Sequence, residues 1–252
     1  MNWKYFIGRQ TSGIIDFFLS SKGMPLLDAV PHGLSWPFDV KRFSGDKNKH
    51  VIFDVGAHRG ETSLYLNKFF PEADIFAFEP VKDNFKDLQE LTRHKKQIRC
   101  FNTAMGSKET DMEILINPDS ERNSLVEKPF MPGQRREHIK VTAIDKFCAE
   151  NKISHIDILK SDTEGYDLEV MKGAQAMLDK NSVQFIYSEI GFEPSDVEKT
   201  LLGDLYDYLG AKRFKLCGFY ENFYWGEKKQ FFGFCNALFI NPEFRKEQNK
   251  PL

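Results

Sequence analysis

From residue 51 onward, the chain switches repeatedly between two patterns of hydrophobic and polar positions. Short apolar runs rich in Val, Ile and Phe indicate buried strands, and several of the segments between them repeat apolar residues at helical spacing. Strands that alternate with helices predict an α/β domain with a mostly parallel sheet. The predicted strands are Val51–Phe53, Asp74–Phe78, Ile98–Thr103, Ile156–Lys160, Val183–Ser188, Lys212–Cys217 and Phe232–Ile240. The predicted helices begin at Glu61, Val81, Asp167 and Asp196, and the last three end at Arg93, Met171 and Tyr208.

An added pair of strands is predicted between the third and fourth of these strands. Glu109–Ile116 alternates apolar and polar residues, and Ile139–Ile144 is expected to pair with it, before a helix that ends near Glu150. Residues 117–137 between the two strands are polar and rich in proline. Loops of this length are usually functional or disordered, so this segment is interpreted either as a lid or as a mobile surface loop.

The first 49 residues are predicted to form an extension to a domain that covers residues 50–245. Trp3, Phe6 and Ile7 stand at helical spacing, which indicates one or two short helices docked on the main domain. The alternatives are an interfacial membrane helix or a dimer contact, although the polar face lacks the lysines typical of a membrane binder. Prolines and glycines in residues 23–50 indicate an irregular connection.

A glycine turn follows the first strand. Asp54 ends the strand, Gly56 and Gly60 bracket the turn, and Ala57 and His58 lie within it. A glycine at this place in an α/β fold lets a ligand approach the backbone. A dinucleotide is disfavoured because His58 replaces the middle glycine of its motif and because Asp54 would repel a phosphate. A cationic ligand without phosphate fits better, and S-adenosyl-L-methionine, which carries a sulfonium and an ammonium group, is such a ligand.

The second strand ends at another acid. Glu79, followed by Pro80, stands about 20 residues after Gly60, the spacing at which an acid holds the ribose hydroxyls of a nucleotide ligand. A carboxylate suits a cis-diol because it accepts two hydrogen bonds. The third strand ends at Asn102 and Ala104, where the adenine is expected to rest.

Three further carboxylates are expected at the same edge of the sheet. Asp162 and Glu164 follow the fourth strand, and Glu189 ends the fifth. Asp162 is the first candidate for a general base, with Glu164 and Glu189 behind it. The same oxygens could instead hold Mg²⁺. Glu164 also suits a helix N-terminus for electrostatic reasons alone, and His58 is a rival base.

The order of the motifs VIFDVGAHRG, AFEP and LKSDTEGYDLEVMKGA, with a closing pair of strands, resembles the FkbM family of S-adenosylmethionine-dependent O-methyltransferases over roughly residues 50 to 240. Members typically have Asn where this chain has His58. The resemblance implies a Rossmann-like class I methyltransferase fold, with a seven-stranded sheet, an antiparallel last strand and helices on both faces. It also implies methyl transfer to a hydroxyl, often on a sugar or a polyketide.

Composition and charge exclude several other classes. A net charge of −2 does not indicate the basic surface typical of nucleic-acid-binding proteins. No apolar run approaches the ~18 residues of a membrane span. The N-terminus does not resemble a secretory signal, because Lys4, Arg9 and Asp16 interrupt it. The four cysteines form no C-x-x-C pair and are expected to be reduced. We therefore predict a cytoplasmic protein, with a homo-oligomer left open.

These observations together predict an O-methyltransferase that uses S-adenosyl-L-methionine on a small-molecule or glycan acceptor, with a sugar hydroxyl of a glycan or glycolipid precursor preferred. A natural-product enzyme of the polyketide type and a non-catalytic cofactor-binding scaffold are the alternatives. Five aromatic residues between the last two predicted strands could form a rim that stacks on a sugar ring, or could pack a hairpin or a dimer interface. They are Phe219, Tyr220, Phe223, Tyr224 and Trp225.

Overall fold

The computed structural model describes residues 30–45, 49–117, 123, 125–126 and 133–244. The chain divides into two compact units, residues 1–47 and 48–252. The helices predicted near Trp3 lie outside the described residues. Within the first unit, helix α2 covers Trp36–Ser44, where an irregular connection was expected. That expectation was wrong because Pro37 stands in the first turn of the helix, a position where proline costs no hydrogen bond.

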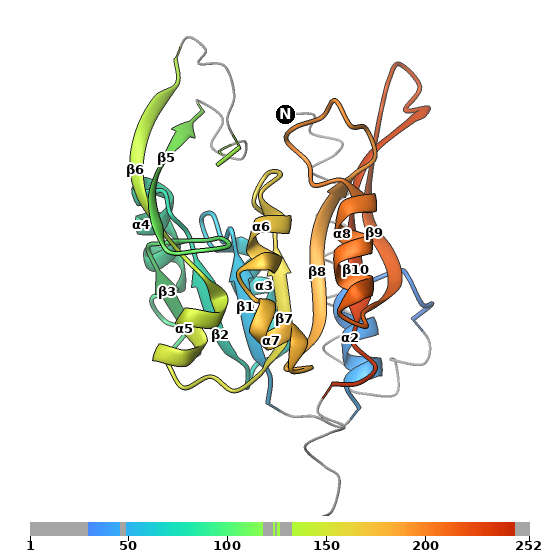
Figure 1. Cartoon of the computed structure of the whole chain (residues 1–252), viewed down its shortest axis with the longest axis horizontal. Helices are drawn as coiled ribbons and strands as arrows, with labels where there is room; N and C mark the ends of the chain where they lie inside the picture. The colour runs from blue at the N-terminus through green and yellow to red at the C-terminus, as the bar shows by residue number, and fades with distance from the viewer. Residues whose placement is uncertain (1–29, 46–48, 118–122, 124, 127–132, 245–252) are drawn as a thin grey trace, which may run out of the picture. The chain divides into compact units, whose positions relative to one another are not determined.

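The second unit is organised around a seven-stranded sheet in the order β3-β2-β1-β7-β8-β10-β9 (Figure 1). β3, β2, β1, β7 and β8 pair in parallel, whereas β10 is antiparallel to both β8 and β9. This arrangement confirms the predicted class I methyltransferase fold. The strands are β1 (Val51–Val55), β2 (Asp74–Phe78), β3 (Ile98–Phe101), β7 (Ile156–Ser161), β8 (Val183–Gly191), β9 (Lys215–Trp225) and β10 (Phe231–Ile240).

Helices cover both faces of this sheet, as predicted. The main core cluster joins one face to α5 (Ile144–Glu150), α6 (Asp167–Lys172), α7 (Gln175–Asp179) and α8 (Leu202–Ala211). Phe53, Phe78 and Phe147 meet in this core, with ring centroids 4.9–5.8 Å apart. On the other face lies α3 (Glu61–Phe69), which sends a hydrogen bond to β1, and α4 (Lys82–Thr92) packs beside α3.

Helix α8 begins later than predicted. The expected start at Asp196 was wrong, because residues 192–201 form a loop before Leu202. The Asp196 carboxylate accepts a hydrogen bond from the backbone N–H of Glu198 at 3.0 Å. Such a local side-chain bond offers the backbone an alternative to the helix. The loop has a functional consequence, because it brings Lys199 to the end of β8.

A second sheet contains the added strands. β6 (Arg135–Thr142) pairs antiparallel with β5 (Thr110–Ile116) and parallel with β4 (Ala104–Met105). The pairing confirms the prediction, but the strand begins at Arg135, so the predicted 117–137 loop was too long. The alternation of apolar and polar residues is interrupted at Glu137, because this charged residue takes an inward position of the strand. Its carboxylate accepts a hydrogen bond from the Lys82 N–H at 3.0 Å. The lid prediction falls mostly outside the described residues.

The last two strands form a long hairpin. The aromatic residues expected in a loop instead lie within β9, and β9 runs parallel to β8. In Figure 1 the hairpin and the β5/β6 sheet both extend beyond the end of the main sheet where β1, β7 and β8 finish. All four cysteines are free thiols, in agreement with the prediction. Among the described residues, none of the helices combines the length and the apolar composition that a membrane crossing requires.

Candidate active site

The glycine turn lies between the carboxyl ends of β1, β2 and β7. Gly56 and Gly60 adopt left-handed φ angles of 73° and 97°, and the N–H groups of Gly56 and Ala57 both donate to the Phe78 carbonyl. A Cβ at Gly56 would lie 1.9 Å from the backbone oxygen of Asp162. Gly56 is therefore needed for the close approach of the chain after β7, a role that the sequence did not suggest. The glycine turn and the segment that contains Asp162 therefore pack directly against each other.

Replacing Gly56 with Ala is expected to destabilise the packing of the glycine turn against the Asp162 segment. The left-handed φ alone costs about 1–3 kcal/mol in a residue with a Cβ, and the Asp162 backbone must also move. We expect a lower free energy of unfolding by urea titration. Gly203→Ala is the matched control, because its Cβ enters open space on helix α8, and it should be neutral or stabilising. An equal effect of both substitutions would contradict the packing role of Gly56.

Asp54 is fully buried within β1 rather than at the turn. Its carboxylate forms an ion pair with the Lys160 ammonium at 2.9 Å and accepts a hydrogen bond from Ser63 Oγ at 2.6 Å. Burial lowers the pKa of Lys160, but the carboxylates of Asp54 and Asp162 outweigh it and the net pKa is raised. Asp54 is therefore not the source of repulsion for a phosphate that the sequence suggested, because Lys160 neutralises its charge.

Glu79 fixes the turn to the end of β2. Its two carboxylate oxygens accept backbone N–H bonds from His58 at 3.0 Å and from Val81 at 2.9 Å. Burial raises the pKa of Glu79 to about 7, although these hydrogen bonds act in the opposite direction. His58 adopts a left-handed φ of 49°, a conformation in which Asn and His are both enriched. The Asn typical of the family and the His58 of this chain therefore suit the same backbone.

The predicted adenine edge lies beside Glu79. Asn102 donates its side-chain amide to the backbone oxygens of Glu79 at 3.0 Å and of Pro80 at 2.9 Å. Ala104 is buried in β4. Hydrogen bonds thus link Asn102 to Glu79 and Pro80 at the ends of β2 and β3. The binding of adenine by Asn102 and Ala104 stays a prediction.

Asp162, Glu164 and Glu189 come together as expected. One carboxylate oxygen from each lies within 4.8 Å of the others. Glu189 lies inside β8, which continues to Gly191, rather than at its end. The Lys199 ammonium bonds Glu164 Oε2 at 2.7 Å and also pairs with Glu189. Asp162 remains the most accessible of the three, with 41% of its side chain exposed against 18% for Glu164 and 10% for Glu189.

The cluster holds protons near neutral pH. Burial, followed by the charge of Asp162, raises the pKa of Glu189 to about 9, and Lys199 only partly opposes this. Burial also raises the pKa of Glu164 to about 7, with Lys199 lowering it and Asp162 raising it. Acids whose pKa values are raised in this way, in a cluster at the end of the sheet, are typical of active sites.

Glu189→Gln is expected to flatten the dependence of stability on pH. The pKa of Glu189 is about 9 in the folded chain against an ordinary value of 4.5, so the folded state binds more protons between these values. Stability is then full below about pH 4.5 and falls as pH rises toward 9. Urea unfolding across this range should show a shallower fall for the variant. The Glu169→Gln control should not flatten it, because the pKa of Glu169 is lowered by Lys172; equal slopes for wild type and Glu189→Gln would refute the assignment.

The three carboxylates provide the oxygen ligands that Mg²⁺ prefers, but the site does not fit the ion. Lys199 already supplies a positive charge to Glu164 and Glu189. A divalent cation would have to lie beside this buried ammonium, whose side chain is 9% exposed. We therefore assign no metal to the site, and the predicted Mg²⁺ has no support here.

Sequence reasoning missed two lysines. Lys160 stands in the buried strand β7, and its register opposite Asp54 is the signal that could have revealed the pair. Lys199 was assigned to a helix, so nothing pointed to its position. Asp167, taken only as a helix residue, is also buried and accepts hydrogen bonds from Ser161 Oγ at 2.5 Å and Thr200 Oγ1 at 3.2 Å. These bonds connect the ends of β7 and of the Lys199 loop.

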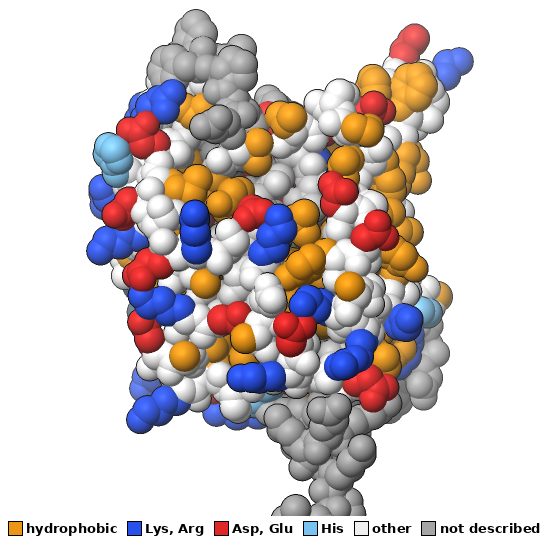
Figure 2. Space-filling view, in the orientation of Figure 1, with side chains coloured by type: hydrophobic (Ala, Val, Ile, Leu, Met, Phe, Trp, Pro, Cys, Tyr) orange, Lys and Arg blue, Asp and Glu red, His pale blue; other side chains and the backbone are white. Residues whose placement is uncertain are grey.

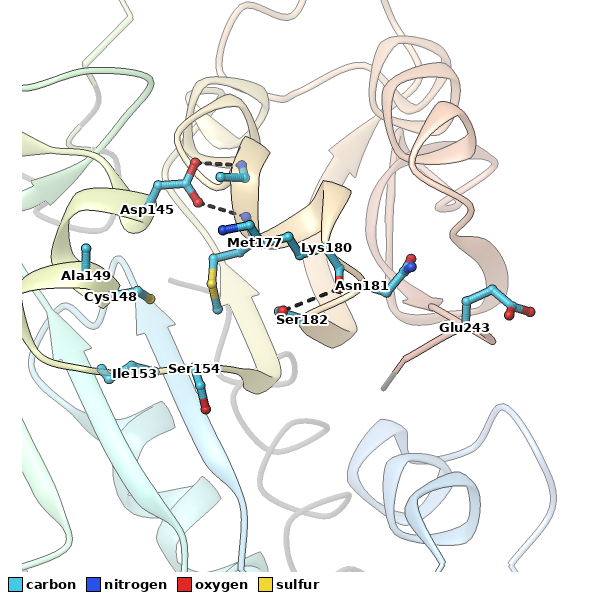
Figure 3. Close-up of a pocket in the computed structure, with 11 residues that line it drawn as sticks. Asp145, Cys148, Ala149, Ile153, Ser154, Met177, Lys180, Asn181, Ser182 and Glu243 are labelled. Carbon is cyan, nitrogen blue, oxygen red and sulfur yellow. Dashed lines mark hydrogen bonds between the residues drawn. The ribbon is translucent and has the colours of Figure 1, made fainter. Parts of the chain in front are cut away.

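A separate pocket lies away from this site (Figure 3). Ser154 and Ser182, which precede β7 and β8, place its volume of about 550 Å³ at the opposite end of the sheet. Asp145 lines it but accepts the N–H groups of Ala176 and Met177, at 2.7 and 3.0 Å, and so begins helix α7. Burial raises the pKa of the Cys148 thiol to about 12. The pocket shows no arrangement of groups for catalysis.

Several known proteins are similar to this chain. A hexuronic acid methyltransferase, AglP, of Haloferax volcanii is 29% identical over 154 residues, which is 60% of this chain and 61% of that protein. The 2-O-methyltransferase NoeI of Sinorhizobium fredii is 24% identical over 160 residues, 57% of this chain and 64% of NoeI. The matched region thus spans less than two thirds of each relative.

The chain is also similar to a solved structure and to the model of a protein family. The crystal structure of methyltransferase FkbM from Methylobacillus flagellatus matches 77% of this chain and 44% of its own, with 17% identity and a TM-score of 0.51, which supports the fold. The model of the Methyltransferase FkbM domain matches residues 54–219, and this match confirms the resemblance inferred from the motifs. The chain therefore belongs to the FkbM methyltransferase domain family.

Proposed function

We propose that the protein is an S-adenosyl-L-methionine-dependent O-methyltransferase that acts on a sugar hydroxyl of a glycan or glycolipid precursor. Membership of the FkbM family supports methyl transfer. Two relatives whose names specify a hexuronic acid and a 2-O position support a sugar acceptor.

The contact between Asp162 and the glycine turn carries this proposal. The Asp162 backbone lies against Gly56, while its side chain is partly exposed among the other carboxylates. A candidate base and the predicted cofactor turn are therefore adjacent parts of one segment. Methyl transfer to an alcohol requires such proximity, because the acceptor oxygen must lose its proton close to the methyl donor.

The residues at the ends of β1–β3 fit the cofactor. Glu79 Oε1 accepts hydrogen bonds from Val81 and Asn84, whereas Oε2 accepts one from His58, which leaves Oε2 acceptor capacity for a ribose hydroxyl. Gly56, Ala57, His58 and Gly60 would hold the methionine end, as predicted for the turn. When bound, S-adenosyl-L-methionine supplies a methyl group on a positively charged sulfur.

The carboxylate cluster would prepare the acceptor. Asp162 accepts the proton of the sugar hydroxyl as a general base. Lys199 contacts both Glu164 and Glu189 and holds them in place. Glu189, with its pKa raised by burial to about 9, keeps a proton near neutral pH and can donate a hydrogen bond to the acceptor.

Calorimetric titration with S-adenosyl-L-methionine, followed by transfer of a radiolabelled methyl group, tests the proposal. The acceptor panel contains oligosaccharides with and without a hexuronic acid, together with hydroxylated polyketides. We expect cofactor binding and labelling of a sugar. Labelling of the polyketides alone would reassign the protein to natural-product methylation. Cofactor binding without any methyl transfer would favour a scaffold, and the absence of cofactor binding would refute the proposal.

A further inference from the structure

The tip of the β9/β10 hairpin exposes large aromatic side chains. Tyr224 and Trp225 end β9, Phe231 and Phe232 begin β10, and we refer to these four residues with the turn between them as the aromatic tip. Their exposed fractions are 44%, 56%, 48% and 38%. Figure 2 shows orange side chains along the projecting hairpin. Isolated exposed apolar residues are ordinary, but a contiguous group marks an interaction surface.

Cross-strand pairing explains only part of this pattern. Trp225 pairs with Phe231 and Tyr224 with Phe232, at ring centroid distances of 4.8 and 5.0 Å. Phe192, which follows β8, packs against Phe232 at 4.8 Å. Such pairs stabilise a hairpin, and they also hold the rings in fixed positions. The outer surface of each ring still faces solvent, so the pairing leaves these outer surfaces without an internal role.

The aromatic tip lies too far from the carboxylates to bind one sugar ring held beside them. Asn236 of β10 pairs directly with Glu189. Phe231 stands five residues further along the strand, and at about 3.4 Å per residue this separation is about 17 Å. A single sugar ring held beside Asp162 would not span this separation to Trp225 or Phe231. The distal rings therefore require a larger partner than the reacting sugar.

The chemistry of the tip fits a lipid surface. Trp and Tyr concentrate at membrane interfaces, where one part of the ring is apolar and the other wet. Lys228 and Lys229 lie in the turn between the aromatic strand ends, against a single acid, Glu227. Lysines that lie close to a membrane surface are attracted to anionic lipid headgroups. We propose that the aromatic tip docks the protein on the surface of an anionic lipid bilayer, with Trp225 and Phe231 entering the interface.

This docking would place the candidate active site toward the membrane. β9 runs parallel to β8, so the tip extends from the same end of the sheet as the three carboxylates (Figure 1). An acceptor whose sugar is attached to a lipid anchor would then be presented to that end of the sheet. Docking itself does not depend on methyl transfer, and its test needs no turnover.

Flotation of the full chain with lipid vesicles tests the proposal. The probes are vesicles of phosphatidylcholine alone and of equal parts phosphatidylcholine and phosphatidylglycerol. We expect flotation with the anionic vesicles and little with the neutral ones. Trp225→Ala/Phe231→Ala should weaken partitioning at least about tenfold. Lys228→Gln/Lys229→Gln, which keeps every aromatic pair, should weaken it about fivefold for each lysine and reduce its salt dependence.

Two matched controls separate docking from general effects. Tyr206→Ala removes an aromatic ring of similar exposure, 51%, from helix α8, and Lys95→Gln/Lys96→Gln removes two consecutive exposed lysines elsewhere. Both should float like the wild type, and thermal unfolding checks that all variants fold. No flotation of the wild type, or equal loss in the controls, would overturn the proposal. A dimer that only Trp225→Ala/Phe231→Ala dissociates, with no lipid binding, would also overturn it in favour of a second copy.

Discussion

Asp162→Asn is expected to lower kcat for methyl transfer by about 10²–10⁴, the contribution typical of a general base. The amide has nearly the same shape as the carboxylate but cannot accept the proton of the acceptor hydroxyl. The affinity for S-adenosyl-L-methionine should change little, because the turn contacts Asp162 through its backbone. Radiolabelled transfer gives kcat, and calorimetry gives the cofactor affinity of the same preparation.

The fold should tolerate this substitution. Lys160 lies 3.8 Å from Asp162 but keeps its shorter ion pair with Asp54 at 2.9 Å. Asp204→Asn, at an exposed position in the first turn of α8, is the control and should leave kcat unchanged. A kcat for Asp162→Asn equal to the wild-type value would move the base to Glu164 or Glu189, whose Gln variants would then be compared.

Lys199→Ala should have the largest effect on stability, a loss of about 3–5 kcal/mol in the free energy of unfolding. The variant leaves Glu164 and Glu189 buried without their common cation. It also removes the ammonium that lies 4.7 Å from the centre of the Phe234 ring. Urea unfolding above about pH 9, where both glutamates are charged, measures the loss, which should become smaller toward neutral and acidic pH as the two glutamates take up protons.

The same variant also tests the absence of a metal. Without Lys199, the three carboxylates could accept a divalent cation, so Mg²⁺ should restore part of the lost stability of Lys199→Ala and have no effect on the wild type. Lys172→Ala breaks an ion pair of two half-exposed side chains with Glu169 and should cost at most about 1 kcal/mol. Equal losses for the two lysines, or stabilisation of the wild type by Mg²⁺, would contradict this account of the cluster.

The sequence was informative where burial and topology act together. Ile75–Phe78 is an uninterrupted apolar run, and the predicted limits Asp74–Phe78 agree with those of β2. Asp162 and Glu189 could be placed together without coordinates, because the carboxyl ends of neighbouring parallel strands meet at one edge. Only the types of residue and the order of strands were needed for these predictions.

The remainder depended on contacts between distant segments. The charge of Asp54 was judged from its neighbours in the chain, whereas Lys160, its partner, is more than a hundred residues away. Gly56 was assigned to a ligand because the approach of Asp162 is a tertiary contact. Lys199 reaches the cluster from a loop before the next helix, in which the Asp196 carboxylate accepts a hydrogen bond from the Glu198 N–H. No repeating pattern of hydrophobic and polar residues in the sequence predicts these contacts.

Strand β9 closes one side of the sheet, and this position has a consequence for self-association. Its eleven residues pair with β10 on one side only within the main sheet. A long regular edge is a template for adding a strand from another molecule, which leads to fibrils. The pairing of β9 with β10 shifts register at three places, and such irregularities twist an edge and interrupt its row of free backbone groups. We infer that this uneven edge protects the chain against amyloid-like stacking.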